Sequence, residues 1–296
     1  MNKILNPLVS ILIPVFNREN LVGETISSIQ NQTYTNWECV LVDDGSTDDS
    51  LKVLQDIAFH DSRVKIFSRP KDRSKGAAAC RNVAFEHSHG EYIQYFDSDD
   101  LMLPTMLEEK VKLLNSNHKL DFVVSKMGRF DENGPLDLID YPLKSSNLIE
   151  DFLTYQVFFL TPGPLFKKRF LEKFEIKFDE LLHRRQEREF YTRVILENPS
   201  YLTSDQVHCL RRIHSESIKF KYDREKPSSK VWAKFMFYRS LYKNSKGNIA
   251  GLMQDYFGRE ISRMSLFFLR VGQVLKAIEV LRFRVELGKK ANQKVE

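Results

Sequence analysis

The chain has few cysteines, and none of them has the spacing of a disulfide framework or a metal site. Its 296 residues include three cysteines, and no two of them form a C-x-x-C pair. This small, odd number argues against a disulfide-stapled secreted domain and against a structural zinc site. A reducing compartment such as the cytosol fits this composition best.

Long apolar runs and two nucleotide-binding motifs are also missing. No segment approaches the roughly 20 apolar residues of a membrane-spanning helix, and the first residues lack an apolar stretch of signal-peptide length. We therefore expect a protein that is neither exported by that route nor integral to a membrane. No G-x-G-x-x-G follows the first predicted strand, and G-x-x-x-x-G-K-[ST] is absent. These absences disfavour a dinucleotide cofactor and a triphosphate-binding loop.

What the chain does have is enough apolar surface for a packed core, since 42% of its residues are hydrophobic and 12% aromatic. Short apolar runs predict strands at residues 9–13, 37–42, 64–67, 91–96 and 121–124. Helical spacing appears at residues 17–32, 48–57 and 76–89. Strands that alternate with helices predict an α/β fold with a Rossmann-like, mainly parallel sheet. Residues 131–147 are expected to form a loop or hairpin.

Acidic turns follow two of the predicted strands. Asp97-Ser98-Asp99-Asp100 follows residues 91–96, and Asp43-Asp44-Gly45 follows residues 37–42. The carboxyl ends of parallel strands meet at one edge of a sheet, so these turns predict a divalent-cation and nucleotide site. The alternatives are a helix cap for the first cluster and an Asx turn for the second. One capping carboxylate would suffice, so three of them favour a site.

The turn after the first strand runs from Pro14 to Arg18 and suits a nucleoside. Its aromatic residue, Phe16, can stack on a base, although core packing is an equal alternative. Asp44 can accept the imide proton of a uracil. Asp99 would then bind a metal that bridges two phosphates, and Asp97 would assist through the ribose or a metal-bound water.

Four ordered motifs resemble the family 2 glycosyltransferases: Ser10 to Asn17, Val42 to Asp48, Gly76 to Asn82 and Tyr95 to Asp100. The resemblance covers roughly residues 7–110. It implies an A-type glycosyltransferase fold and inverting transfer from a nucleotide-sugar donor. By that likeness, the residues that contact the nucleoside are Pro14, Phe16, Asn17 and Asp44. Arg81 and Asn82 would shape the donor site, and Asp97-Ser98-Asp99 would be the metal-binding triplet for Mn²⁺ or Mg²⁺.

Inverting transfer needs a general base that deprotonates the acceptor hydroxyl. The family places an Asp in an E-D-x-E/D-like segment at the start of a helix, and Arg185 to Tyr191 resembles that segment. Glu187 falls at the position of the Asp, and Gln186 replaces the usual Glu. We expect Glu187 to be the base, with Glu189 as its substitute; a solvated helix face is the alternative.

A second segment, residues 210–218, resembles the family's closing Y-R-x-H-x-x-S-x-S-like motif. The resemblance implies that His214 approaches the metal or the diphosphate and that Arg211 offsets phosphate charge in the donor site. A purely structural histidine is the alternative at this position.

The charge of the chain is uneven. Residues 230–296 carry a net charge of +9, whereas residues 1–229 carry −4. Helical spacing continues through residues 230–296. A solvated helical face accounts for their positive charge without any nucleic-acid partner. Peripheral contact with a membrane that holds a lipid-linked acceptor is one alternative, and packing against the catalytic domain or a second subunit is another, which we favour over the membrane.

These patterns predict a catalytic domain over residues 7–225, with a donor half at 7–110 and an acceptor half at 111–225, followed by a helical basic region at 226–296. The predicted protein is a metal-dependent inverting glycosyltransferase that uses a UDP-sugar in surface polysaccharide synthesis, in the cytoplasm or at the cytoplasmic face of the membrane. One rival is a non-catalytic nucleotide-sugar binding protein. A nucleotidyltransferase is another, but the Gly-rich basic turn expected after its first strand is missing.

Overall fold

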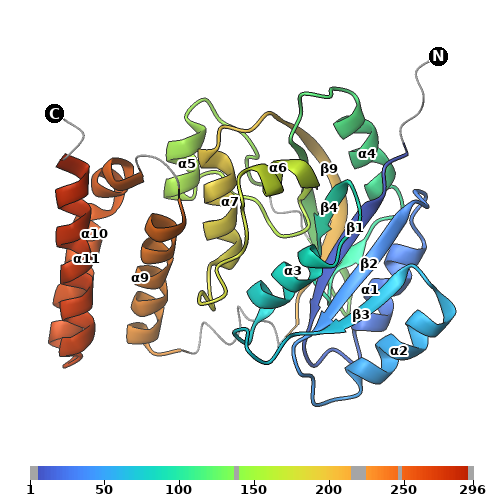
Figure 1. The fold of residues 1–296 in the computed structure, drawn as a ribbon, viewed down its shortest axis with the longest axis horizontal. Coiled ribbons are helices and arrows are strands. Elements are labelled where there is room, and N and C mark those ends of the chain that lie inside the picture. The colour runs from blue at the N-terminus through green and yellow to red at the C-terminus, as the bar shows by residue number, and fades with distance from the viewer. Residues whose placement is uncertain (1–5, 137–139, 215–224, 246–248, 293–296) are drawn as a thin grey trace.

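The computed structural model describes residues 6–136, 140–214, 225–245 and 249–292, and it consists of a sheet with helices on both faces and a group of helices at one end (Figure 1). The strands are β1 (Val9–Val15), β2 (Trp37–Asp43), β3 (Val64–Ser68), β4 (Tyr92–Tyr95), β5 (Leu101–Met102), β6 (Phe122–Asp131), β7 (Gly134–Leu136), β8 (Pro164–Lys167) and β9 (Tyr201–Arg212). The helices are α1 (Val22–Gln30), α2 (Ser50–His60), α3 (Ala77–Glu86), α4 (Met106–Asn115), α5 (Leu148–Thr154), α6 (Lys168–Lys173), α7 (Gln186–Leu196), α9 (Pro227–Asn244), α10 (Ile249–Arg270) and α11 (Val274–Asn292).

The sheet has the order β3-β2-β1-β4-β8-β6-β9-β5, with β7 paired to β6. The first four strands in this order are parallel, and β6 and β9 are also parallel to each other. Strand β8 runs antiparallel to both of its neighbours, β4 and β6. The predicted Rossmann-like, mainly parallel sheet is confirmed, and β8 is the antiparallel insertion that the sequence pattern does not indicate.

Alternating side chains of the strands divide the core between the two faces of the sheet. In β1, Leu12 packs with α3 and α7 on one face, whereas Ile11 and Ile13 pack with α1 and α4 on the other. Successive strand residues point to opposite faces, so two apolar layers bury every residue of β1 except Pro14, which is half-buried. A strand buried in this way holds the turn that follows it in a fixed position.

Two predicted boundaries shift for local reasons. The helix predicted at residues 17–32 begins only at Val22, because Asn17 takes a left-handed backbone conformation with φ 51°. The segment predicted as a loop or hairpin at residues 131–147 contains β7, which pairs with β6 as a hairpin.

A buried lysine ties α4 to the turn before β8. Lys110 is 1% exposed, and its Nζ donates hydrogen bonds to the carbonyl oxygens of Pro162 and Gly163, both at 2.7 Å, and to Gln94 Oε1 at 3.2 Å. Burial lowers the pKa of Lys110 to about 7. Three acceptors satisfy the ammonium group, so the turn at residues 160–163 is anchored to the sheet.

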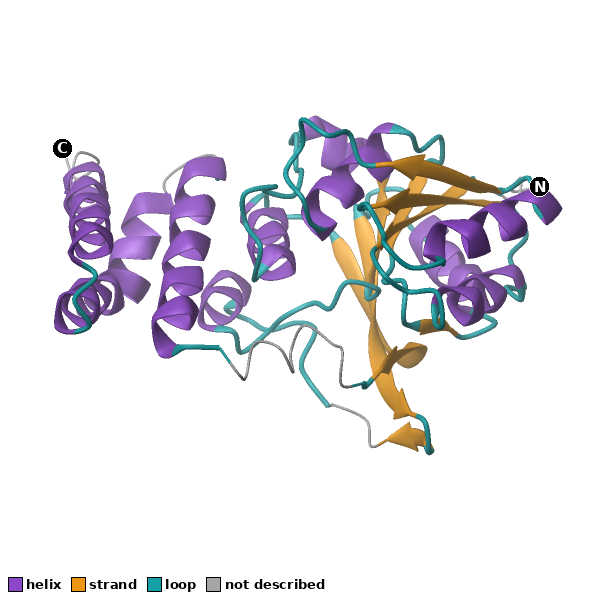
Figure 2. Cartoon of the chain, turned by 90° about the horizontal axis from the view of Figure 1, so that it is seen from below, coloured by secondary structure: helices purple, strands orange, loops and turns teal. Residues whose placement is uncertain are grey.

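Helices α9, α10 and α11 pack together at the end of the molecule opposite β3 (Figure 2). Their shared core also includes Leu153 of α5 and Leu182 from the segment before α7. The helices therefore pack against the half of the chain that follows the donor turns. Within the described residues, no helix is long and apolar enough to cross a bilayer.

Candidate active site

The turns after β1 and β2 are bonded to each other. The backbone N–H of Asn17 donates to Ser46 Oγ at 3.0 Å, and Asn17 Oδ1 accepts from the backbone N–H of Thr47 at 2.9 Å. An asparagine tolerates the positive φ of this position better than most residues. The two turns therefore form one rigid corner at the carboxyl edge of the sheet.

The two aspartates after β2 have different partners. Asp43 Oδ2 accepts from the backbone N–H groups of Gly45 and Ser46, at 3.0 and 3.1 Å, which is the Asx-turn arrangement. Asp44 is buried and forms an ion pair with Arg69, the residue that follows β3. Asp43 therefore shapes the turn, while Asp44 presents a carboxylate whose position Arg69 fixes.

Phe16 is 38% exposed at the same corner, and Lys75 Nζ lies 4.1 Å from the centre of its ring. Pro14, within β1, is half-buried and pairs with Val42 of β2. An exposed aromatic ring beside a buried carboxylate is the arrangement that a stacked base needs.

Arg81 joins two carboxylates from distant parts of the chain. Its Nη2 donates to Asp97 Oδ1 at 2.7 Å and lies 3.6 Å from Glu187 Oε1. Its Nη1 donates to Gln186 Oε1 at 3.3 Å, and the side chain is 3% exposed. The structure thus brings together Asp97, after β4, and Glu187, in the first turn of α7. Arg81 is therefore a buried residue of the site and not a solvated charge on the surface of α3.

Asp99 lies between side chains that follow two separate strands, Arg18 after β1 and His214 after β9. Its Oδ2 is 3.1 Å from His214 Nε2 and 3.2 Å from Arg18 Nε and Nη2. Ser98, between the two aspartates, is buried. Residues 215–218, the second half of the predicted closing motif, lie outside the described residues.

The described residues contain no group of three or more His, Cys, Asp or Glu side chains arranged to hold a metal ion. Asp99 and His214 are the pair close enough to share one cation, and Asp97 is turned toward Arg81 instead. A carboxylate and an imidazole suit Mn²⁺, and a diphosphate would have to supply further oxygens. The donor set therefore fits a cation held jointly by protein and nucleotide.

Burial and like charge disfavour ionisation of the neighbouring carboxyl groups. Burial raises the pKa of Asp100 well above its usual value, and the charges of Asp97 and Asp99 add to this effect. Burial also raises the pKa of Asp97, although Arg81 opposes the shift. A cation or further donors at this edge would relieve that repulsion. The backbone N–H of Arg212 already donates to Asp100 Oδ1 at 3.0 Å.

A cleft of about 280 Å³ lies beyond these carboxylates. Its polar walls come from the turn after β4, the turn at residues 160–162, the start of α7 and the end of β9, and include Asp97, Asp100, Thr161, Arg185, Glu187, Arg188 and Arg211. Aromatic side chains close the far side, among them Tyr155, Phe158 and Phe159. Glu187 and Arg211 both lie in this cleft.

The prediction that Glu189 can substitute as the base is wrong, because this side chain does not reach the cleft. It is fully buried, and its two carboxylate oxygens accept hydrogen bonds from Nε and Nη2 of Arg193, each at 2.8 Å. Two residues along a helix correspond to a rotation of about 200°, so Glu189 faces the core when Glu187 faces the cleft.

Asn82 does not face the cleft either. It is 4% exposed, and it exchanges two hydrogen bonds of 2.9 Å with the backbone of Phe178. Its Nδ2 also donates to Glu180 Oε1 at 2.9 Å. Asn82 therefore fixes the segment that leads into α7 and does not itself contact a donor.

Three polar residues of the site are absent from the sequence prediction: Arg18, Arg69 and Thr161. Arg18 stands in the turn after β1, so its position in the sequence could have marked it as a site residue. Arg69 follows β3 directly, as the other site residues follow their strands, which is a weaker signal. Thr161 Oγ1 lies 3.4 Å from Glu187 Oε1, but no local pattern marks it, since only the long-range pairing of β8 brings it there.

An open α/β sheet with carboxylate-bearing turns at one edge and a cleft beyond them defines the class of A-type glycosyltransferase folds. The chain belongs to glycosyl transferase family 2, whose family model matches residues 10–174, more than half of the sequence. This match extends beyond the motifs at residues 7–110 and includes β8.

Two curated relatives each match less than half of the chain. An uncharacterized glycosyltransferase of Haemophilus influenzae is 42% identical over 112 residues, which cover 38% of this chain and 44% of the relative. The Escherichia coli protein named UDP-Glc:alpha-D-GlcNAc-diphosphoundecaprenol beta-1,3-glucosyltransferase WfgD is 39% identical over 112 residues, covering 38% of this chain and 42% of the relative. These matches span less than half the length of either relative.

Solved structures share the fold over nearly the whole chain. Staphylococcus aureus TarS 1–349 in complex with UDP has a TM-score of 0.59 at 19% identity, covering 92% of this chain and 89% of that one. The mannosyltransferase PcManGT of Pyrobaculum calidifontis, in complex with GDP-Man and Mn²⁺, has a TM-score of 0.59 at 17% identity, covering 96% and 76%. The A-type fold with a helical C-terminal region is therefore confirmed.

Proposed function

We propose that this protein is a metal-dependent, inverting glycosyltransferase that moves a sugar from a UDP-sugar to a hydroxyl group of a glycan or lipid-linked acceptor. The observation that carries the proposal is the position of Arg81 between Asp97, on the donor edge, and Glu187, in the cleft. Family membership supports sugar transfer, and the activity that the name of WfgD gives supports a lipid-linked acceptor. We propose that the transfer serves surface polysaccharide synthesis. The reaction would take place in the cytoplasm, at the cytoplasmic face of the membrane.

In the proposed reaction, Phe16 stacks on the base and Asp44 accepts its imide proton, while Pro14 and Asn17 shape the nucleoside pocket. Glu187 takes the proton of the acceptor hydroxyl as that oxygen bonds to the anomeric carbon and the nucleoside diphosphate leaves. Arg81 and Thr161 lie against Glu187 Oε1. Its Oε2 has no hydrogen-bond partner in the described part of the chain, so it is available for the acceptor proton.

Asp99 and His214 would hold Mn²⁺ or Mg²⁺, with Asp97 beside them. When bound, the cation would neutralise charge that develops on the departing diphosphate. Two cationic side chains lie near this edge, Arg18 beside Asp99 and Arg211 in the cleft. Their positive charge would also help to neutralise the departing diphosphate.

The test is release of UDP from a panel of UDP-sugars, with Mn²⁺, with Mg²⁺ and with EDTA. Metal-dependent release with one sugar would support the transferase and name its donor. Tight UDP binding without release, in the presence of lipid-linked and glycan acceptors, would favour the non-catalytic binding protein. Release of pyrophosphate in place of UDP would indicate a nucleotidyltransferase.

We further propose that helices α9, α10 and α11 contact the membrane peripherally. Aliphatic side chains of α10 and α11 are exposed, including Leu266, Leu269, Val274, Leu275, Leu281 and Val285. Basic residues such as Arg270, Arg282 and Lys289 are exposed on the same two helices, which suits an anionic bilayer. Co-sedimentation with anionic vesicles should be lost on substitution of Leu275 and Val285 by Ser; a change from dimer to monomer in the same variant would instead indicate a second copy.

A further inference from the structure

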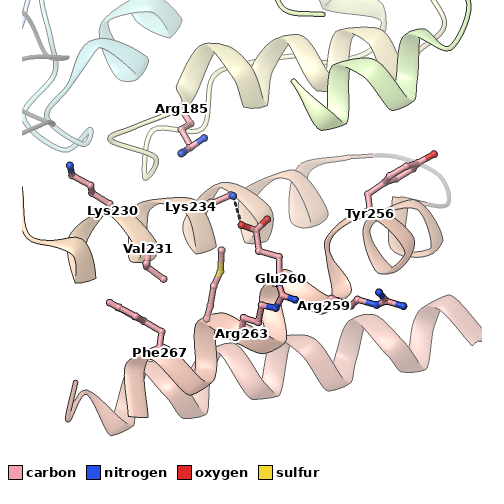
Figure 3. Close-up of a pocket in the computed structure, with 10 residues that line it drawn as sticks. Arg185, Lys230, Val231, Lys234, Tyr256, Arg259, Glu260, Arg263 and Phe267 are labelled. Atoms are coloured by element: carbon pink, nitrogen blue, oxygen red, sulfur yellow. Dashed lines mark hydrogen bonds and ion pairs between the residues drawn. The ribbon is translucent and has the colours of Figure 1, made fainter. Parts of the chain in front are cut away.

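A second pocket, of about 760 Å³, lies between the start of α7 and helices α9 and α10 (Figure 3). We call it the basic pocket, because half of its ten lining residues are cationic: Arg185, Lys230, Lys234, Arg259 and Arg263. Figure 3 shows Arg185 entering from the side of α7, opposite the residues of α9 and α10. Two separate parts of the chain therefore contribute positive charge to one space.

Acidic residues of the basic pocket do not balance its positive charge. Glu260 is its one acidic residue among the described lining. That carboxylate already binds Lys234 and accepts a hydrogen bond of 2.5 Å from Tyr238 Oη. Arg259 and Arg263 form no hydrogen bond or ion pair with any residue that the structure describes. Clustered cations without partners attract an anionic ligand.

The basic pocket and the active-site cleft share one residue. Arg185 lines both of them, and it stands two positions before Glu187. Its backbone is left-handed, with φ 60°, at the point where α7 begins. Burial, and then the charge of Arg185, lower the pKa of Arg188 in the cleft. The positive potential therefore continues from the basic pocket toward the proposed base.

The rest of the basic pocket lining is mainly apolar. Val231, Met264 and Phe267 supply hydrocarbon surface to the lining, and Figure 3 shows Val231 and Phe267 on the side of Lys230. A single phosphate would need neither this hydrocarbon surface nor a volume of about 760 Å³. An anion with a hydrocarbon chain attached matches both parts of the lining.

We infer that the basic pocket binds the diphosphate and the first hydrocarbon units of a lipid-linked acceptor, whose sugar lies in the cleft beside Glu187. This inference rests on the proposed transferase function and deepens it by assigning the acceptor's lipid end to α9 and α10. Arg259 and Arg263 bind the diphosphate oxygens, and Arg185 lies between that diphosphate and the sugar. The source of the anion is the acceptor lipid and not free phosphate.

The test is calorimetric titration of the full chain with farnesyl diphosphate and with inorganic pyrophosphate, both in saturating UDP and Mg²⁺ so that the donor site is filled. The variant is Arg259→Gln with Arg263→Gln, since both side chains are exposed and their replacement leaves the core intact. The matched control is Lys112→Gln with Lys119→Gln, which removes two exposed cations from α4 and the segment after it. UDP affinity and UDP release without acceptor are measured on all three proteins.

We expect farnesyl diphosphate to bind the wild type more tightly than pyrophosphate, and the double variant to bind it at least tenfold more weakly. The control should keep wild-type affinity, and UDP affinity should not change. Equal weakening in the control, no weakening in the double variant, or equal affinity for pyrophosphate would each overturn the inference. Failure of the proposed function gives a different result, namely that all three proteins either do not bind UDP or bind it and release none from any UDP-sugar.

Discussion

The donor side and the acceptor side of the cleft are built in different ways. Donor residues follow adjacent parallel strands, and hydrogen bonds between neighbouring turns, such as that from Thr47 to Asn17, lock these turns together. Acceptor-side residues such as Thr161 and Glu187 come from segments that meet only through long-range contacts, and Lys110 and Arg81 fix their positions. Buried cations therefore hold the acceptor-side residues in position, whereas neighbouring parallel strands hold the donor-side residues.

The sharpest way to break this comparison is to remove Asp99. We expect Asp99→Ala to lower metal-dependent UDP release by roughly 10³-fold or more, because a cation that stabilises the leaving group loses its carboxylate. Metal-dependent UDP affinity should fall as well. Asp72→Ala, which removes an exposed carboxylate, serves as the control. Normal release by Asp99→Ala at saturating Mn²⁺ would refute this role.

On the acceptor side, Glu187→Gln should lower turnover by roughly 10²- to 10³-fold and leave UDP affinity unchanged, since it removes a base and no donor contact. Steady-state kinetics and UDP titration measure the two quantities separately.

Glu189→Gln is the matched control, with the same chemical change two residues away. It leaves Arg193 buried without its counter-ion, so we expect a loss of about 3–5 kcal/mol in the free energy of unfolding. Turnover per folded molecule should stay near that of the wild type. If Glu189→Gln loses turnover and Glu187→Gln does not, the roles given to the two residues are reversed.

Lys110→Met tests whether a buried cation holds the acceptor side. The variant removes three hydrogen bonds, although Gln94 Nε2 still donates to Pro162 O and the backbone N–H of Ser125 to Gly163 O. We expect a loss of about 1–3 kcal/mol in stability, and KM for the acceptor should rise more than KM for the donor. Since burial lowers the pKa of Lys110 to about 7 from 10.5, the unfolded chain binds more protons between these values. Wild-type stability should therefore rise with pH from about 7 to 10.5, and chemical denaturation should show a smaller rise in the variant.

The last prediction concerns stability alone and has the smallest expected effect on turnover, because Glu38 lies in the donor half at the end of β2 far from the site. Although burial acts in the opposite direction, hydrogen bonds from Lys65, Ser10 and the backbone N–H of His89 lower the pKa of Glu38 from 4.5 to about 2. A depressed carboxyl pKa stabilises the fold above the unfolded value, so up to about 3 kcal/mol should be lost as pH falls from 4.5 to 2. Denaturation of Glu38→Gln should show a flatter dependence over this range; an equal slope would contradict the assignment.

The same comparison explains which parts of the fold and of the site could be predicted from the sequence. Strands β1 to β4 and their turns were predictable, because each apolar run and the Asp43 or Asp97 turn after it are local patterns. Strand β8 was not, since its residues pair with β4 and β6, far away in the chain. The choice between Glu187 and Glu189 depends on the rotation of α7 against the core. A clue was present in the sequence, as Glu189 and Arg193 stand four residues apart, the spacing of an ion pair on a helix.

Asn82 and Arg81 show the same limit on α3. Adjacent helical residues are rotated by about 100°, so a motif that contains both cannot say which one faces the ligand. The structure separates them: Arg81 reaches the carboxylates of the site, and Asn82 bonds to the backbone of Phe178.

The three cysteines are all buried, and burial raises the pKa of the Cys80 and Cys209 thiols to about 12 and that of Cys39 still further. A thiol reacts through its thiolate, so none of them should react with maleimide reagents in the folded protein. One new cysteine at the exposed Phe59 of α2 and one at the exposed Leu275 of α11 would then take fluorophores without any change to the native residues. The pair would report, in one molecule, the separation between the donor end and the helical end during turnover.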